Sequence, residues 1–90
     1  MANHKSAVKE HRQSLVRRER NRYHRARLRT ALKKCREAIA AGDVERARGL
    51  LDPTLSLLDR TAKHGALHDN AAARTKSRLT RAVNRLAAAS

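Results

Sequence analysis

The stretch that most constrains the fold of this chain is RRERNRYHRARLR, residues 17–29. Seven of its thirteen residues are arginine and only one is acidic. On a helix, like charges three or four residues apart repel each other by about 0.2–0.5 kcal/mol for each pair. We therefore expect this segment to be frayed or disordered when free, and helical once a polyanion neutralises it.

The rest of the chain is also basic. Its 90 residues contain 22 Lys and Arg, of which 16 are Arg, against 8 Asp and Glu, and the formal net charge is +14. Such an excess favours a polyanionic partner through counterion release, and arginine favours phosphate, which it binds through two parallel hydrogen bonds. Nucleic acid is the first candidate and an anionic membrane surface the second. The arginine segment lacks the apolar face of a membrane-bound helix, and no apolar run approaches the roughly 18 residues of a membrane span.

The positive charge is concentrated at the two ends of the chain. Residues 1–36 carry 13 basic and 2 acidic side chains, residues 37–62 carry 3 and 5, and residues 63–90 carry 6 and 1. The net charges of these segments are therefore +11, −2 and +5. Because this length is typical of one domain, we expect a single domain over residues 1–90, with a near-neutral packing element between two basic ones.

The apolar content predicts helices around a small core. There are 11 Leu and one Tyr but no Phe or Trp, and Leu and Ala favour helix. So small a core predicts marginal stability without the partner. The single cysteine excludes an internal disulfide and suits a reducing, cytosolic compartment. The opening MANHKSAVKEHRQS has no apolar run of the kind a secretory signal needs.

Two turn signals divide the chain into three helices. In AAGD, residues 40–43, Gly42 stands where a helix ends and Asp43 where the next is capped. In KHGALHDN, residues 63–70, Gly65 ends the second helix, and Asp69 is the preferred cap of the third. Both connections are short, so neighbouring helices should run antiparallel.

Apolar residues recur at helical spacing within each predicted helix. The three stripes are Leu28, Leu32, Cys35 and Ile39; Val44, Ala47, Leu51, Leu55, Leu58 and Ala62; and Ala72, Leu79, Val83 and Leu86. Facing inward, they predict an all-α three-helix bundle over residues 28–87. The basic residues 1–27, here called the arm, should protrude as the first half of an extended first helix. At Pro53 we expect a kinked but continuous second helix, with room for the bend beside Gly49, rather than a break capped by Asp52.

Arginines form three rows at helical spacing. The rows are Arg18, Arg22, Arg25 and Arg29; Arg17, Arg20 and Arg27, with His24 between them; and Arg74, Arg78, Arg81 and Arg85. The first two lie on different sides of the arm, which therefore suits a cleft between two phosphate backbones. The third lies away from the core stripe of its own helix, where a solvated polar face is an equal alternative.

Other candidate sites have less support. His64 and His68 have a spacing that could serve a metal, but HExxH and CxxC patterns are absent. We expect these histidines to face phosphate or cap helix ends, and we predict no metal and no cofactor. Cys35 is interpreted as a buried thiol, and no catalytic constellation indicates an enzyme. Tyr23 could stack on a base or pack against arginine stems.

Four stretches of the chain resemble the S-twenty family of proteins of the bacterial small ribosomal subunit. They are MANHKSAVK at 1–9, RLRTALKK at 27–34, AGD at 41–43 and DRTAKHGALHDNAAARTKSRL at 59–79. The resemblance implies a three-helix bundle with an extended first helix and direct binding to 16S ribosomal RNA in the lower body of the subunit. It also implies a role in assembling and stabilising that subunit, a cytoplasmic ribosomal location, a monomer within the particle and no catalysis. Pro53, Gly49 and the arginine-rich residues 17–25 depart from the family pattern.

The arginine rows and the resemblance together indicate which residues bind RNA. They are Asn3, Lys5, Ser6, Lys9, Arg12, Arg17, Arg18, Arg20, Asn21, Arg22, Arg25, Arg27, Arg29, Lys33, Lys34, His68, Asn70, Arg74, Lys76, Arg78 and Arg81. Because A-form RNA hides its base edges in a deep, narrow groove, recognition should be mostly of shape and phosphate positions. The alternatives are a DNA-compacting, nucleoid-type protein and an interaction protein acting through the flank of Leu50 and Leu57.

Overall fold

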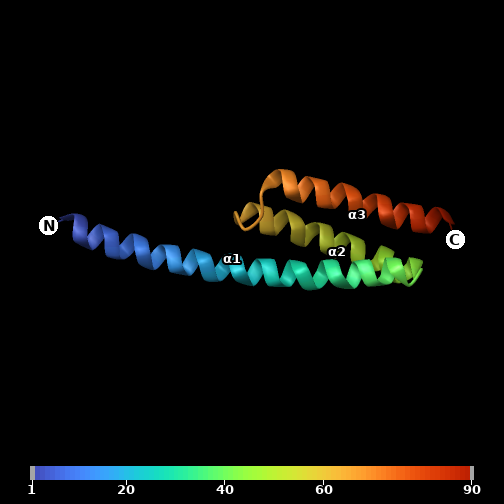
Figure 1. Ribbon diagram of the computed structural model, residues 1–90, viewed down its shortest axis with the longest axis horizontal. Helices are drawn as coiled ribbons and strands as arrows, with labels where there is room; N and C mark the ends of the chain where they lie inside the picture. The colour runs from blue at the N-terminus through green and yellow to red at the C-terminus, as the bar shows by residue number, and fades with distance from the viewer. Residues whose placement is uncertain (1, 90) are drawn as a thin grey trace.

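The computed structural model describes the backbone of residues 2–89 and the side chains of residues 6–89. The chain folds into three helices, α1 (Ala2–Ala40), α2 (Val44–Lys63) and α3 (Asp69–Ala89) (Figure 1). The all-α prediction with a long first helix is therefore confirmed. The molecule measures 68 × 20 × 15 Å, and its radius of gyration is 17.8 Å, against roughly 12 Å for a compact domain of this length.

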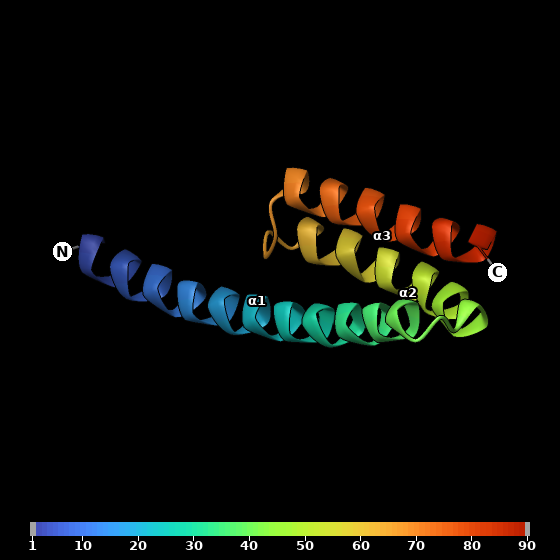
Figure 2. The ribbon, with the colours of Figure 1, turned by 45° about the vertical axis from the view of Figure 1, so that its right-hand side comes forward.

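The helices pack in chain order. In both views of the ribbon, α2 lies between α1 and α3, and each connection reverses the direction of the chain (Figures 1 and 2). The predicted antiparallel arrangement is confirmed. Contacts between α1 and α3 are sparse compared with those that each makes with α2, so α2 is the element that holds the other two together.

Both turns use a left-handed glycine to end a helix. Gly42 has φ +73° and Gly65 has φ +77°. After α1, the N–H of Asp43 donates to the carbonyl of Ala38 at 3.0 Å, and the N–H of Gly42 donates to that of Ile39 at 3.1 Å. The same pair of bonds follows α2, and in both places it defines a Schellman motif.

The caps that begin α2 and α3 differ. The side chain of Asp43 accepts a hydrogen bond from the backbone N–H of Arg46 at 3.2 Å, as predicted. The predicted cap at Asp69 is wrong, because Asp69 is already the first residue of α3. His68 stands at the capping position, where its Nδ1 accepts from the backbone N–H of Asn70 at 3.1 Å. An imidazole nitrogen thus serves as the side-chain acceptor that satisfies an otherwise unpaired N–H at the helix start.

The predicted apolar stripes line the core. The buried members are Leu28, Cys35, Ala47, Leu58, Ala72, Leu79 and Val83, to which the structure adds Ala38. The others pack at the edges, among them Leu32, Ile39, Leu51, Leu55 and Leu86. Two polar residues that the stripes did not include, Thr54 and Thr61, are also buried. Their hydroxyls donate to carbonyls of their own helix, at 2.6 Å to Leu50 and 2.7 Å to Leu57, which removes the cost of burying them.

Helix α2 runs through Pro53 without interruption. The expected continuity is confirmed, and the alternative of a break capped by Asp52 is wrong. Proline removes one hydrogen bond to the carbonyl four residues earlier, here that of Gly49, and both residues are exposed, so water can reach the freed carbonyl. The kink itself stays a prediction.

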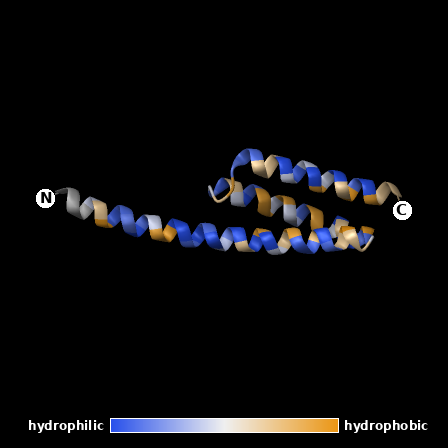
Figure 3. Ribbon diagram, viewed as in Figure 1, coloured by the Kyte–Doolittle hydropathy of each residue, from blue (hydrophilic) through white to orange (hydrophobic). Residues whose placement is uncertain are grey.

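The first half of α1 extends beyond the other helices (Figure 1). The side chains of residues 6–20 are all exposed, Asn21 and His24 are half-buried, and Leu28 is the first buried residue among the described side chains, residues 6–89. Hydrophilic residues dominate this part of the helix (Figure 3). None of the three described helices has the length and apolar character that crossing a bilayer requires. The division into an arm of residues 1–27 and a bundle of residues 28–87 stays a prediction.

Candidate nucleic-acid interface

The described side chains of the arm, residues 6–27, present their cations to solvent without neutralising them internally. Its basic side chains from Lys9 to Arg27 are all exposed. Among the side chains of residues 6–89, the structure records one ion pair, and it lies elsewhere, between Lys76 and Asp59. Glu19, the acidic residue within the arginine stretch, makes no such pair with Arg22 across one helical turn. The charge of the arm is therefore available to an external anion.

The predicted RNA-binding residues of α1 follow this pattern. Ser6, Lys9, Arg12, Arg17, Arg18, Arg20, Arg22, Arg25, Arg27, Arg29, Lys33 and Lys34 are exposed, whereas Asn21 is half-buried. The side chains of Asn3 and Lys5 lie outside the described residues. Two arginines make contacts within the helix: Arg25 Nε donates to the carbonyl of Asn21 at 3.4 Å, and Arg27 Nη1 donates to the hydroxyl of Tyr23 at 3.3 Å.

A second set of exposed cations lies on α3. The row of Arg74, Arg78, Arg81 and Arg85 is exposed along its whole length, while Leu79 and Val83 of the same helix are buried. The predicted separation of core and cations on α3 is therefore present. His68 and Asn70 are exposed at the start of the helix, where His68 also serves as the cap described above.

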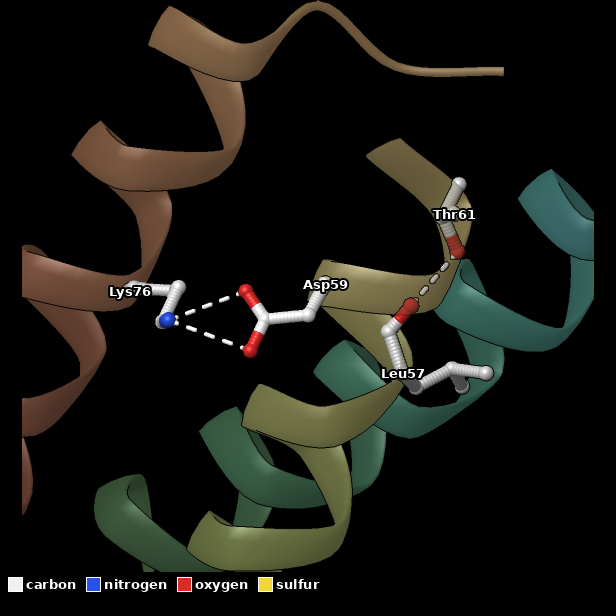
Figure 4. A network of polar contacts seen from close by, with 4 residues as sticks. All are labelled: Leu57, Asp59, Thr61 and Lys76. Carbon is white, nitrogen blue, oxygen red and sulfur yellow. Dashed lines mark hydrogen bonds and ion pairs between the residues drawn. The ribbon is translucent and has the colours of Figure 1, made fainter. Parts of the chain in front are cut away.

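Lys76 is the predicted RNA-binding residue whose position differs most from the rest. It is half-buried, and its Nζ donates to both carboxylate oxygens of Asp59, at 2.9 and 3.2 Å (Figure 4). The pair joins α3 to α2, and its side chains are 38% and 61% exposed. Exposed pairs of this kind contribute at most about 1 kcal/mol. Part of the positive charge of Lys76 is thus neutralised by Asp59 within the bundle.

Two stacked histidines mark the place where the arm meets the bundle. The rings of His24 and His64 lie 4.3 Å apart between centroids and within 11° of parallel. Nδ1 of His24 and Oδ1 of Asn21 are buried without a hydrogen-bond partner in the structure. Burial lowers the pKa of His24 below its usual 6.5, and the nearby charges of His64, Arg20 and Arg27 lower it further. The neutral imidazole is therefore the form that this junction favours.

A groove between α1 and α2 was not predicted from the sequence. It has a volume of about 740 Å³, and its lining comes from these two helices alone. The lining residues are Tyr23, Ala26, Arg27, Thr30, Ala31, Lys34, Leu50, Pro53, Thr54, Ser56, Leu57 and Arg60. Arg60, which sequence reasoning did not single out, joins Arg27 and Lys34 there. The flank of Leu50 and Leu57, predicted above only as the surface of an alternative interaction protein, was the available signal.

The structure gives no support to metal or catalytic chemistry within the described residues. No three His, Cys, Asp or Glu side chains gather as a metal site would require. Cys35 is fully buried, as predicted, and burial raises the pKa of its thiol, against a smaller opposite effect of Arg36. A neutral, inaccessible thiol is a poor nucleophile.

These features define a class: small basic helical proteins with exposed rows of arginine. Comparison with known proteins then specifies the family. The family model described as Ribosomal protein S20 matches residues 2–84. The chain belongs to this family, which confirms the resemblance seen in its motifs. Membership also makes it a ribosomal protein of a structural, non-enzymatic kind.

Individual relatives agree over nearly the whole chain. The small ribosomal subunit protein bS20 of Desulfovibrio desulfuricans is 49% identical over 88 residues, which cover 98% of this chain and 99% of the relative. That of Maridesulfovibrio salexigens is 47% identical over 87 residues, covering 97% and 100%. That of Citrifermentans bemidjiense is 45% identical over 86 residues, covering 96% and 99%.

Proposed function

We propose that this protein is a structural constituent of the bacterial small ribosomal subunit in the cytoplasm. There, as a single copy, it binds 16S ribosomal RNA directly and stabilises the folding of the RNA and the assembly of the subunit. The observation that carries the proposal is the set of exposed arginines along a helix that projects from a small core. Family membership supports it, because the relatives are small-subunit proteins along their full length.

The arm is the principal contact with RNA. Helix α1 has 39 residues, which corresponds to about 58 Å at 1.5 Å per residue. Its two arginine rows face different sides, so the arm can neutralise two phosphate backbones at once. Each guanidinium binds phosphate oxygens through parallel hydrogen bonds. Once it is helical on the RNA, the arm is a rod with cations on two sides, and it links RNA segments that would otherwise repel each other.

The row on α3 supplies a second contact. Arg74, Arg78 and Arg81 are exposed on the outer helix of the bundle, and α2 separates this helix from α1 (Figure 2). The protein therefore offers cations at both its elongated arm and its bundle. Binding at both places holds two regions of RNA at a fixed separation, which favours the folded RNA over its open forms.

The salt dependence of binding tests the phosphate contacts. Arg22→Ala and Arg25→Ala should each weaken binding to 16S ribosomal RNA and reduce the slope of log K against log salt by about 0.7–0.9, the value for one released counterion. Gln13→Ala, at an exposed neutral position of the same helix, is the matched control and should leave the slope unchanged. If both arginine variants keep the parent slope, the phosphate assignment is wrong.

Competition separates this proposal from DNA compaction. Folded 16S ribosomal RNA and duplex DNA of equal length are offered together at near-physiological salt. The proposal expects the RNA to be retained and the DNA to be displaced, because a folded RNA can bring separate helices to the arm and to α3 at once, whereas a straight duplex is a single helix. Equal retention of both would point to a nucleoid-type function.

A further inference from the structure

The groove between α1 and α2 combines an apolar floor with a cationic rim. Leu50 and Leu57 are half-buried along it, and Pro53 adds a further apolar surface. Arg27, Lys34 and Arg60 also line the groove, and no Asp or Glu does. Helix α3 packs on α2 without contributing to the lining, so no part of the described chain covers this surface.

Tyr23 lines this groove and contacts two neighbouring side chains, Arg27 and His24. Its side chain is 57% exposed. The Arg27 guanidinium lies 5.5 Å from the ring centroid and donates to the tyrosine hydroxyl at 3.3 Å. The His24 ring meets that of Tyr23 edge-on, with centroids 5.5 Å apart. The structure is compatible with both expectations for Tyr23. The ring packs against Arg27, and its exposed surface is large enough for a base to stack on it.

We propose that this groove binds an unpaired nucleotide of RNA, with the base against Tyr23 and the apolar floor and the phosphates between Arg27, Lys34 and Arg60. The inference rests on the proposed function and specifies one of its contacts. Bases that leave a helical stack are bound by stacking on tyrosine or on an arginine plane, and the Tyr23–Arg27 pair offers both. The groove has a volume of about 740 Å³, which is within the 300–1,000 Å³ typical of sites for small organic groups.

Charge and shape together select this occupant. A paired A-form helix presents its phosphates outward and keeps its bases stacked, so it could use the cations but not the apolar floor. A polypeptide could use the floor, but the excess of cations without acids disfavours any segment that is not strongly acidic. An unpaired nucleotide satisfies both parts of the groove. The arginine rows of the arm would then bind RNA by charge alone, whereas the groove, which Tyr23 and Arg27 of the arm also line, would in addition bind an exposed base.

A fluorescent base tests the proposal. The probe is an RNA hairpin with 2-aminopurine in its loop, and the comparison is a fully paired duplex of the same composition. Tyr23 is the only Tyr and the chain has no Phe or Trp, so Tyr23 offers the largest aromatic surface on which the loop base can stack. The parent protein should change the loop fluorescence on binding, and Tyr23→Leu, which keeps the apolar bulk, should reduce that change.

Affinity gives the second readout. Tyr23→Leu should weaken hairpin binding by about 5- to 150-fold, the range of one lost base-stacking contact, and leave duplex binding within twofold. Arg60→Gln removes a phosphate contact instead, and it should weaken hairpin binding more than duplex binding and reduce the salt slope for the hairpin by about 0.7. Arg48→Gln removes an exposed cation of the same helix outside the groove and serves as the matched control for Arg60→Gln, with no loop-specific effect. Circular dichroism and thermal unfolding confirm that each variant is folded.

The two possible failures are distinguishable. If hairpin and duplex bind with equal affinity, and the groove variants change neither, the groove proposal is overturned while the phosphate-binding function stands. If the protein binds neither RNA, both proposals fall. An acidic peptide that displaces the hairpin from the groove but leaves the duplex bound would also overturn the nucleotide assignment.

Discussion

The exposed arm allows a direct test of whether helix formation and charge neutralisation are linked. The side chains of residues 6–20 are all exposed, so tertiary packing does not support this part of α1. Within residues 17–29, four pairs of arginines stand three or four residues apart, and Glu19 with Arg22 forms one attractive pair. The net cost of these pairs to the helix is about 0.6–1.5 kcal/mol.

We predict that residues 2–20 are frayed in dilute buffer and that inorganic polyphosphate makes them helical. The three helices hold 39, 20 and 21 residues, 80 together, and 19 of these lie at positions 2–20. Fraying of those residues should therefore leave the circular dichroism signal at 222 nm about a quarter below its value with polyphosphate. Polyphosphate has no helical signal of its own, so the change reports on the protein.

A charge-reversal variant provides the matched comparison. Arg18→Glu combined with Arg25→Glu converts three repulsive pairs into attractive ones, a change of about 1–3 kcal/mol in favour of the helix. This variant should give a stronger helical signal than the parent without polyphosphate. The reasoning is refuted if the parent protein already gives the full signal at low salt and polyphosphate leaves it unaltered.

Three further outcomes are expected from the fold. Gly42→Ala should lower the free energy of unfolding by about 1 kcal/mol or more, because φ is +73° there. Gly49→Ala should raise the free energy of unfolding by about 0.5–1 kcal/mol, since an added Cβ meets nothing within 4 Å. Urea unfolding measures both changes. In the same assay, Leu58→Ala should cost about 2–5 kcal/mol and the exposed Leu15→Ala less than about 0.5 kcal/mol; equal losses would contradict the assigned core. The pKa of His24 is lower in the folded protein than in the unfolded chain, so the unfolded chain binds the proton first as the pH falls. The contribution of His24 to stability is therefore complete above pH 6.5 and is lost as the pH falls below that value. His24→Phe should show a smaller loss of thermal stability than the parent over that range, and an identical pH profile would exclude the stacked junction as the cause.

The sequence predicted the framework of the fold because its signals are local. The spacing of Leu28, Cys35 and Leu58 gives the core faces without knowledge of the partner helices, and Gly42 with Asp43 marks a turn on its own. The predicted cap of α3 was wrong because His68 and Asp69 are adjacent and the side chains of both can accept the same kind of hydrogen bond. Local chemistry did not decide between them.

Other features depend on contacts between helices and could not be obtained in this way. Thr54 and Thr61 are polar by sequence, yet they are buried because carbonyls one turn earlier accept their hydroxyl protons. The groove exists because α3 packs on α2 away from Tyr23 and Arg60, an arrangement that no stripe specifies. The candidate interface was therefore predictable as rows of cations and not as a shaped surface.

The chain-order packing of the helices bears on how the protein reaches its partner. Because α1 packs mainly on α2, and α2 on α3, most contacts join residues that are close in sequence, and such topologies fold rapidly. The hairpin of the first two helices is complete once Lys63 has left the site of synthesis. A newly made copy can thus present its binding surfaces almost as soon as it is released, which suits the proposed role in assembling the subunit.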